Sequence, residues 1–134
     1  MNDNRINIRG GPFADFVILH HIDDFSSDLD FANRYLNHDY PYGVGVSMDT
    51  ICLWIPLIYC LKTCFHSFDN PLSGLAFYGV TLIPPESLAQ FMEIIRKSMH
   101  LIAAGTEDHA DVLKLLDLLE KAESESKWVV HLGV

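Results

Sequence analysis

The sequence has few basic residues, and it lacks an apolar run long enough to cross a membrane. Nine Lys and Arg stand against 18 Asp and Glu, which gives a formal net charge of -9. This balance argues against binding nucleic acid through its phosphates. The most apolar stretch, from Ile51 to Phe65, is interrupted by Pro56 and Lys62 and is shorter than the roughly 20 residues that a membrane helix needs. We therefore expect neither a nucleic-acid partner nor a membrane.

Cysteines are also scarce. Cys52, Cys60 and Cys64 are odd in number and have apolar neighbours, which favours reduced, buried thiols over a disulfide framework. Cys60 and Cys64 are spaced for one face of a helix, but no second pair completes a zinc motif. The polar start of the chain, Met1 to Arg5, leads into no long apolar stretch and so predicts no secretory signal. We expect a cytoplasmic protein.

No catalytic motif is present: P-loop, G-x-G-x-x-G, G-x-S-x-G and H-E-x-x-H patterns are all missing. The densest group of potential ligands is His20, His21, Asp23 and Asp24. On a strand His21 and Asp23 would share a face, whereas on a helix His20 and Asp24 would meet one turn apart. No third ligand follows at a metal-site spacing, so we expect a polar strand end here, with no catalytic residue, metal or cofactor. A small metal-assisted or acid–base enzyme using these four residues is the alternative.

What the chain does have is the length and apolar content of one globular domain, residues 1–134. Alternation and β-branched residues predict strands at 5–9, 75–83 and 128–134, and favour a strand over a helix at 16–22. Ser26 or Ser27 is expected to cap a helix that runs to about Asn37. Between residues 44 and 55, either a hairpin or a helix capped by Asp49 and kinked at Pro56 fits the pattern. Helix is expected from Leu57 to Phe65.

The clearest periodicity lies in the last third of the chain. Pro84 to Ser87 is expected to begin a helix with one apolar stripe, namely Leu88, Phe91, Met92, Ile95, Met99 and Ile102. Gly105 should end it and Thr106 should cap a second helix with its own stripe of Val112, Leu115, Leu116, Leu119 and Ala122. The predicted fold is therefore α+β, with a small mixed or antiparallel sheet packed against helices and a C-terminal helical hairpin.

Acidic and aromatic residues interleave in the first half of the chain. From Asp15 to Asp49 there are seven carboxylates against the single basic residue Arg34, and interleaved with them are Phe25, Phe31, Tyr35, Tyr40 and Tyr42. Aromatic anchors surrounded by carboxylates are typical of a binding site for a basic protein. The candidate partner-binding residues are Asp23, Asp24, Asp28, Asp30, Tyr35 and Tyr40. A helix with its acids in solvent and its aromatics in the core fits the same pattern equally well.

The chain resembles the small acidic immunity proteins that bacteria encode beside polymorphic or contact-dependent inhibition toxins. The resemblance rests on its size, its acidity, the acidic and aromatic stretch from Asp23 to Tyr42, and the strand-to-helix passage from Val80 to Leu88 that precedes paired helices. It implies a cytoplasmic protein that binds a cognate basic toxin domain, often a nuclease, and occludes its active site. An acidic adaptor subunit of another assembly would share this surface.

Overall fold

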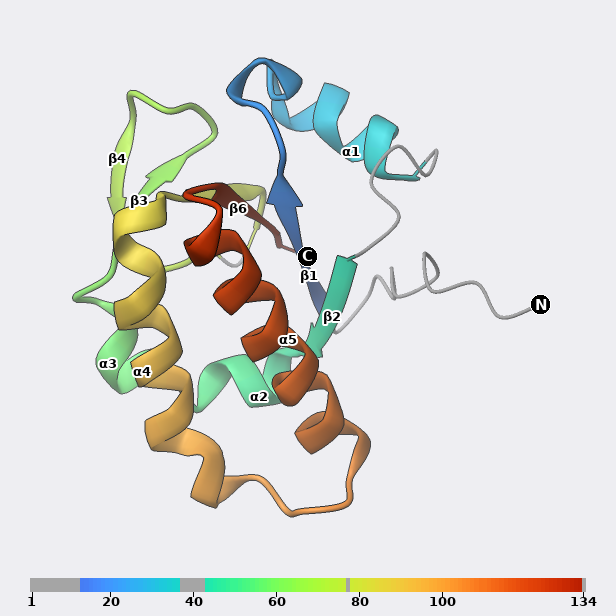
Figure 1. The fold of residues 1–134 in the computed structure, drawn as a ribbon, viewed down its shortest axis with the longest axis vertical. Coiled ribbons are helices and arrows are strands. Elements are labelled where there is room, and N and C mark those ends of the chain that lie inside the picture. Colours follow the sequence, from blue (N-terminus) through green and yellow to red (C-terminus); the bar gives the residue numbers. More distant parts are fainter. Residues whose placement is uncertain (1–12, 37–42, 77, 134) are drawn as a thin grey trace.

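The computed structural model describes residues 13–36, 43–76 and 78–133, which form an α+β fold (Figure 1). The strands are β1 Phe13–Leu19, β2 Gly43–Ser47, β3 Lys62–Phe65, β4 Pro71–Ser73, β5 Val80–Ile83 and β6 Trp128–Leu132. The α-helices are α1 Asp28–Leu36, α2 Met48–Cys52, α3 Ile55–Ile58, α4 Leu88–Ser98 and α5 Glu107–Ser124. Short 3-10 turns occupy Ile22–Asp24 (η2), Pro85–Ser87 (η3) and Met99–Leu101 (η4). No helix among these is long and apolar enough to cross a membrane.

The described strands form one sheet in the order β2-β1-β6-β5-β3-β4, in which neighbouring strands are antiparallel. The predicted return of the chain to the sheet near its end is confirmed, because β6 lies between β1 and β5. Its neighbours are far away in sequence: Phe16 pairs with His131, and His131 pairs with Thr81 on the other side. The last strand therefore joins the two halves of the sheet.

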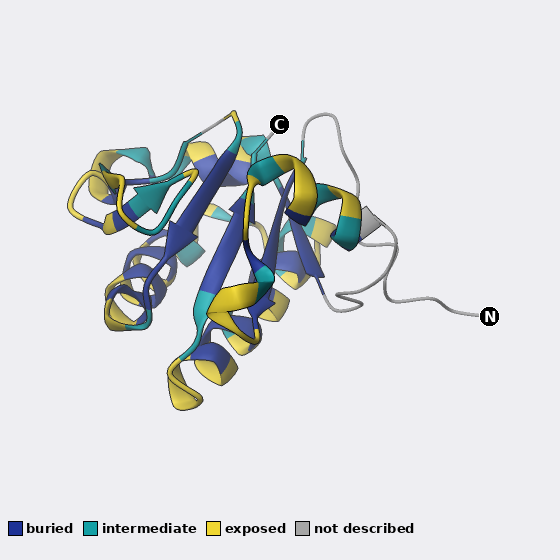
Figure 2. Cartoon of the chain, turned by 90° about the horizontal axis from the view of Figure 1, so that it is seen from above, coloured by how far each residue is buried: buried dark blue, intermediate teal, exposed yellow. Residues whose placement is uncertain are grey.

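Both faces of the sheet are covered, and β1 shows this most clearly. Since successive side chains of a strand point to opposite faces, one face of β1 carries Ala14, Phe16 and Ile18, while the other carries Val17 and Leu19. The first face packs on the side with α2 to α5, and the second packs beneath α1 (Figure 2). Burial on both sides explains why this strand is a nearly continuous apolar run.

The predicted helical hairpin is confirmed in α4 and α5. Leu88, Phe91, Met92 and Ile95 of the first stripe are buried, and Met99 and Ile102 pack against the same core. Gly105 has a φ of 84°, and the Thr106 hydroxyl accepts a hydrogen bond from the backbone N–H of His109. The cap and the left-handed glycine are thus where the sequence places them.

The middle of the chain corrects two expectations. After β2 the chain forms α2 and not a hairpin, and the capping side chain is Ser47, not Asp49, since the Ser47 hydroxyl accepts from the N–H of Thr50. Pro56 lies in the first turn of the separate helix α3 and so kinks nothing. The expected helix from Leu57 to Phe65 is wrong, because α3 ends at Ile58 and residues 62–65 form β3. Pairing with β4 and β5 outweighs the local helical pattern there.

The structure also differs from the expectations for one further strand and for the cysteines. The expected strand at 75–83 begins only at Val80, after a left-handed Gly79 with a φ of 85°. The thiols of Cys52 and Cys60 are exposed and that of Cys64 is partly buried, so the expectation of three buried thiols is wrong, although all three are free. Burial raises the pKa of the Cys64 thiol. The strand expected at 5–9 lies outside the described residues.

His131 of β6 is a titratable group in the apolar core. Its side chain is 1% exposed, and its ring centroid lies 4.8 Å from that of Phe16. Neither ring nitrogen has a hydrogen-bond partner among the described residues. Burial lowers the pKa of His131 to about 3, so the imidazole is neutral in the folded protein.

This burial predicts a loss of stability at mildly acidic pH. The folded-state pKa lies below the ordinary value of 6.5, so the unfolded chain takes up the proton first, and stability falls as the pH drops from about 6.5 towards 3. Between about pH 7.5 and 5.5, the free energy of unfolding should fall about 1.4 kcal/mol more in the wild type than in His131→Leu. Urea denaturation of both proteins at the two pH values measures this, and equal losses would contradict it.

Candidate functional site

The candidate site is the acidic segment that follows β1, made of η2 and α1. The helix begins where the sequence predicts, because the Ser27 hydroxyl accepts a hydrogen bond from the N–H of Asp30 at 3.1 Å. Asp28 and Asp30 lie in the first turn and Arg34 in the last, which suits the helix dipole. Arg34 also donates to the backbone oxygen of Asp24 at 2.9 Å and so ties η2 to α1.

The aromatic residues of this segment lie in the core and not on the surface. Phe25, Phe31 and Tyr35 are all buried, and they belong to the cluster beneath α1. The rings of Phe25 and Phe31 are 5.7 Å apart, and Phe25 also contacts Phe68 at 5.9 Å. Tyr35 was expected as an exposed partner-binding residue, and this placement corrects that expectation: the sheet face beneath α1 is apolar, and the rings bury it.

Burial of the Tyr35 ring also buries its polar hydroxyl group. Its hydroxyl is buried and has no hydrogen-bond partner among the residues that the structure describes. Burial, and secondarily the carboxylate of Asp15, raises the pKa of Tyr35. The phenol is thus a core group, held neutral.

The predicted carboxylates remain on one side of the sheet, but they differ in environment. Asp23 and Asp30 are exposed to solvent. Asp24 is partly buried, and one of its carboxylate oxygens lies 3.9 Å from the Arg34 guanidinium. Asp28 is also partly buried and is hydrogen-bonded to His66. Tyr40 lies outside the described residues.

The exposed apolar side chains of this segment are two aliphatic residues, and not the aromatic residues that were expected. Leu29 is 72% exposed and Ile22 is 57% exposed. The sequence pattern contained this signal for Leu29, because two residues along a helix turn it by about 200°, which places Leu29 opposite the buried Phe31. We name Ile22, Asp23, Leu29 and Asp30 together the η2–α1 surface.

The group of His20, His21, Asp23 and Asp24 does not converge on a metal site. Among the described residues no three His, Cys, Asp or Glu side chains are placed to hold a metal ion. The Nδ1 of His20 lies 3.2 Å from the ammonium of Lys127, which comes from the turn before β6. Burial and the charge of Lys127 both lower the pKa of His20. His20 therefore faces a cation, which is a poor setting for a metal ligand.

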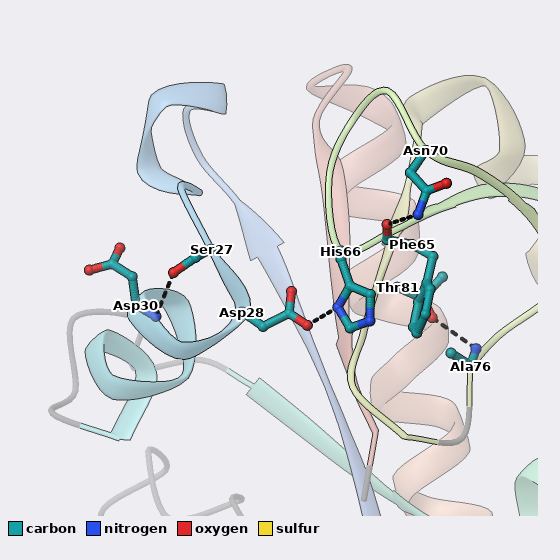
Figure 3. A network of polar contacts seen from close by, with 8 residues as sticks. All are labelled: Ser27, Asp28, Asp30, Phe65, His66, Asn70, Ala76 and Thr81. Carbon is teal, nitrogen blue, oxygen red and sulfur yellow. Dashed lines mark hydrogen bonds and ion pairs between the residues drawn. The ribbon is translucent and has the colours of Figure 1, made fainter.

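Asp28 and His66 form a contact that the sequence pattern does not predict, since 38 residues separate them. A hydrogen bond joins the Asp28 carboxylate to Nδ1 of His66 (Figure 3). His66 has a left-handed backbone with a φ of 66°, and its ring lies against that of Phe65, with the centroids 3.6 Å apart. The contact fixes α1 against the connection between β3 and β4.

An apolar pocket of about 130 Å³ lies on another part of the molecule, beside α2 and α3. Ile51, Ile55, Ile58 and Leu75 form most of its wall, and the polar side chains that line it are those of Tyr59 and Ser73. Its described lining contains no paired acid and base.

The chain matches no protein-family model, no curated protein and no solved structure. Any functional conclusion therefore depends on the chemistry of the site itself.

The burial of Tyr35 generates a prediction about stability. Tyr35→Phe removes a buried hydroxyl without a partner and keeps the ring, so the free energy of unfolding should stay the same or rise by up to about 1 kcal/mol. Tyr35→Ala should lower it by about 3–5 kcal/mol, because the ring packing is lost. Urea denaturation of both variants measures these changes. A large loss in Tyr35→Phe would show that the hydroxyl is satisfied.

Proposed function

We propose that this chain is a cytoplasmic immunity-type protein, which binds a basic toxin domain through the η2–α1 surface and blocks the toxin's active site. The observation that supports the proposal most directly is the exposure of Leu29 and Ile22 beside the carboxylates of Asp23 and Asp30. A metal-assisted enzyme has less support, because no three His, Cys, Asp or Glu side chains among the described residues are placed to hold a metal ion.

Exposed aliphatic side chains supply the affinity in this proposal. Leu29 contributes little to the folded core, since most of its surface remains in solvent. Burying a leucine side chain against a partner is worth about 1.5–3 kcal/mol. A few such anchors at the centre of an interface commonly carry most of the binding energy.

The charge around these anchors selects the kind of partner. Arg34 is the single Lys or Arg between residues 10 and 61, and its guanidinium is engaged by Asp24. By contrast, α4 and α5 carry Arg96, Lys97, Lys114 and Lys121 among their acids. The segment from β1 to α3 is therefore anionic in sequence, and the cation that lies beside it, Lys127 at 3.2 Å from His20, is paired with Glu125. Such a surface attracts basic proteins and speeds their encounter.

Inhibition would follow from occupancy of the partner's own anion site. A toxin that cleaves nucleic acid needs basic groups to hold phosphates. The carboxylates of Asp23 and Asp30 would pair with those groups, and the body of the domain would then exclude the substrate. This mechanism requires no catalytic residue or cofactor in the present chain.

Charge reversal tests the electrostatic part of the proposal. Asp23→Lys/Asp30→Lys should slow association with a basic toxin domain encoded beside this chain by about tenfold or more at low salt, with a smaller effect at high salt. Stopped-flow kinetics at two salt concentrations measure the rates. Asp117→Lys/Glu123→Lys on α5 is the matched control, because it makes the same change in net charge on the other layer. Equal effects of the two double variants would place the contact elsewhere.

Truncation of an anchor tests the apolar part. Leu29→Ser should raise the Kd for the same toxin domain by about tenfold or more, chiefly through faster dissociation, since it removes a side chain that the complex buries. Its free energy of unfolding should match that of the wild type, because Leu29 is exposed. Leu113→Ser, at an exposed leucine of α5, is the control and should leave the Kd unchanged. An unchanged Kd for Leu29→Ser would contradict the proposed surface.

A further inference from the structure

We propose that the pocket beside α2 and α3 binds a small, uncharged and mostly apolar molecule of about the size of benzyl alcohol. The site is separate from the η2–α1 surface, so the inference does not depend on the proposed function. Ile51 and Ile58 of the pocket belong to the core cluster on one face of the sheet, whereas α1 packs on the opposite face. Figure 1 shows α2 and α3 well away from α1 along the long axis of the molecule.

The walls of the pocket are held in place by the fold. Ile51 and Ile58 are buried core residues, so their side chains are fixed where they line the pocket. The residue after β4 is anchored as well. Gly74 donates its backbone N–H to the oxygen of Leu61 at 2.7 Å, and the Thr63 hydroxyl donates to the oxygen of Gly74, also at 2.7 Å. The pocket is therefore formed before any ligand binds.

The glycine at position 74 leaves space in the pocket. Gly74 has a φ of 88°, a left-handed backbone that residues with a side chain rarely adopt. A Cβ at residue 74 would lie 3.6 Å from Cγ2 of Ile58, which lines the pocket. The backbone conformation thus selects a residue without a side chain at a point where a side chain would approach the pocket wall.

The volume of the pocket sets the size of the ligand. It measures about 130 Å³. An apolar cavity of roughly 150 Å³ accepts one benzene molecule. Tyr59 lines the pocket and is 67% exposed, so the pocket reaches the molecular surface beside this ring and a ligand can enter. A single six-membered ring or a branched alkyl group of similar volume therefore fits.

The lining favours a ligand without charge. The pocket is built from the two longest stretches of the sequence that lack Asp, Glu, Lys and Arg, residues 50–61 and 70–85. In a chain with a net charge of -9, this neutrality is a local property of the pocket. A charged ligand would lose hydration there and find no opposite charge in the described lining.

Two hydroxyl groups can orient the ligand. Tyr59 and Ser73 line the pocket, and neither hydroxyl takes part in a hydrogen bond within the part of the chain that the structure describes. Binding sites for small molecules commonly combine apolar walls with a few polar groups of this kind. A ligand with one hydroxyl group can bond to either residue while its apolar part contacts the isoleucines.

The strand beside the pocket favours a free small molecule over the side chain of a peptide. Ser73 of β4 lines the pocket, and β4 lies at one end of the described sheet. Peptides can add to such an edge as a further strand. However, β4 is three residues long and begins with Pro71, which has no N–H to donate. The edge therefore offers a peptide backbone few hydrogen bonds.

A titration with benzyl alcohol tests the inference. The full chain is labelled with carbon-13 in the δ1 methyl groups of isoleucine, and the methyl NMR resonances are followed. Those of Ile51, Ile55 and Ile58 should shift together and saturate with a Kd on the order of 1 mM. The resonance of Ile22, an exposed isoleucine of η2, should not shift. Benzoate and benzylamine, which are charged and similar in size, should bind about tenfold more weakly or worse.

A matched pair of variants locates the binding. Ile55→Phe enlarges a half-buried residue of the pocket wall, so it should weaken benzyl alcohol binding by about tenfold or more. Ile22→Phe makes the same change outside the pocket and should leave the Kd unchanged. Circular dichroism during heating establishes that both variants fold. If Ile55→Phe does not fold, Leu75→Phe replaces it, because Leu75 is another half-buried residue of the wall.

Four results would overturn the inference. The first is a lack of saturable shifts at the three isoleucines, and the second is shifts of Ile22 as large as theirs. The third is equal affinity for benzoate, and the fourth is undiminished binding by the folded wall variant. A blocked tripeptide, acetyl-Gly-Phe-Gly-amide, carries the same benzyl group on a peptide backbone. Tighter binding of this tripeptide than of benzyl alcohol would show a pocket for a partner's side chain and overturn the choice of a free small molecule.

Discussion

The structure depends on apolar burial on both faces of the central strands β1, β6 and β5. One face of these strands is covered by the layer that contains α4 and α5, and the other by α1 with the aromatic residues around it. Without α1, side chains such as Val17, Leu82 and Val130 would be exposed to water. Because this face must be buried, the rings of Phe31 and Tyr35 point into the core. The opposite side of α1 is left exposed to solvent.

The properties of the candidate surface follow from that constraint. Because Phe31 and Tyr35 are drawn into the core, the opposite side of α1 presents Leu29 and Asp30 to solvent. Among the described residues, the apolar part of the η2–α1 surface is therefore aliphatic, with Leu29 on α1 and Ile22 on η2. The same burial holds α1 against the sheet, and the hydrogen bond between Asp28 and His66 adds a second attachment. A rigid surface loses less entropy on binding than a flexible one.

Local sequence patterns predicted the two helices that each bury one apolar stripe, and the β-prone run at the end of the chain. The helices α4 and α5, the Thr106 cap and the return of β6 were predictable for this reason. β3 was not, because residues 62–65 continue a helical apolar pattern, and only their long-range partners at 71–73 and 80–83 make them a strand. The candidate site was predicted in part. Its carboxylates are local features, whereas the contact between Asp28 and His66 arises from the tertiary fold.

The place of β6 in the sheet has a consequence for how quickly the chain can fold. The described strands form two subsets, β2 with β1 and β5 with β3 and β4, and β6 alone connects them. Its partners in β1 lie more than a hundred positions earlier, for example Leu19 opposite Trp128. Closing so large a loop is entropically costly and slows the search for native pairings. Each half has an unpaired edge until β6 joins it, so we expect the docking of β6 to be a late and slow step of folding.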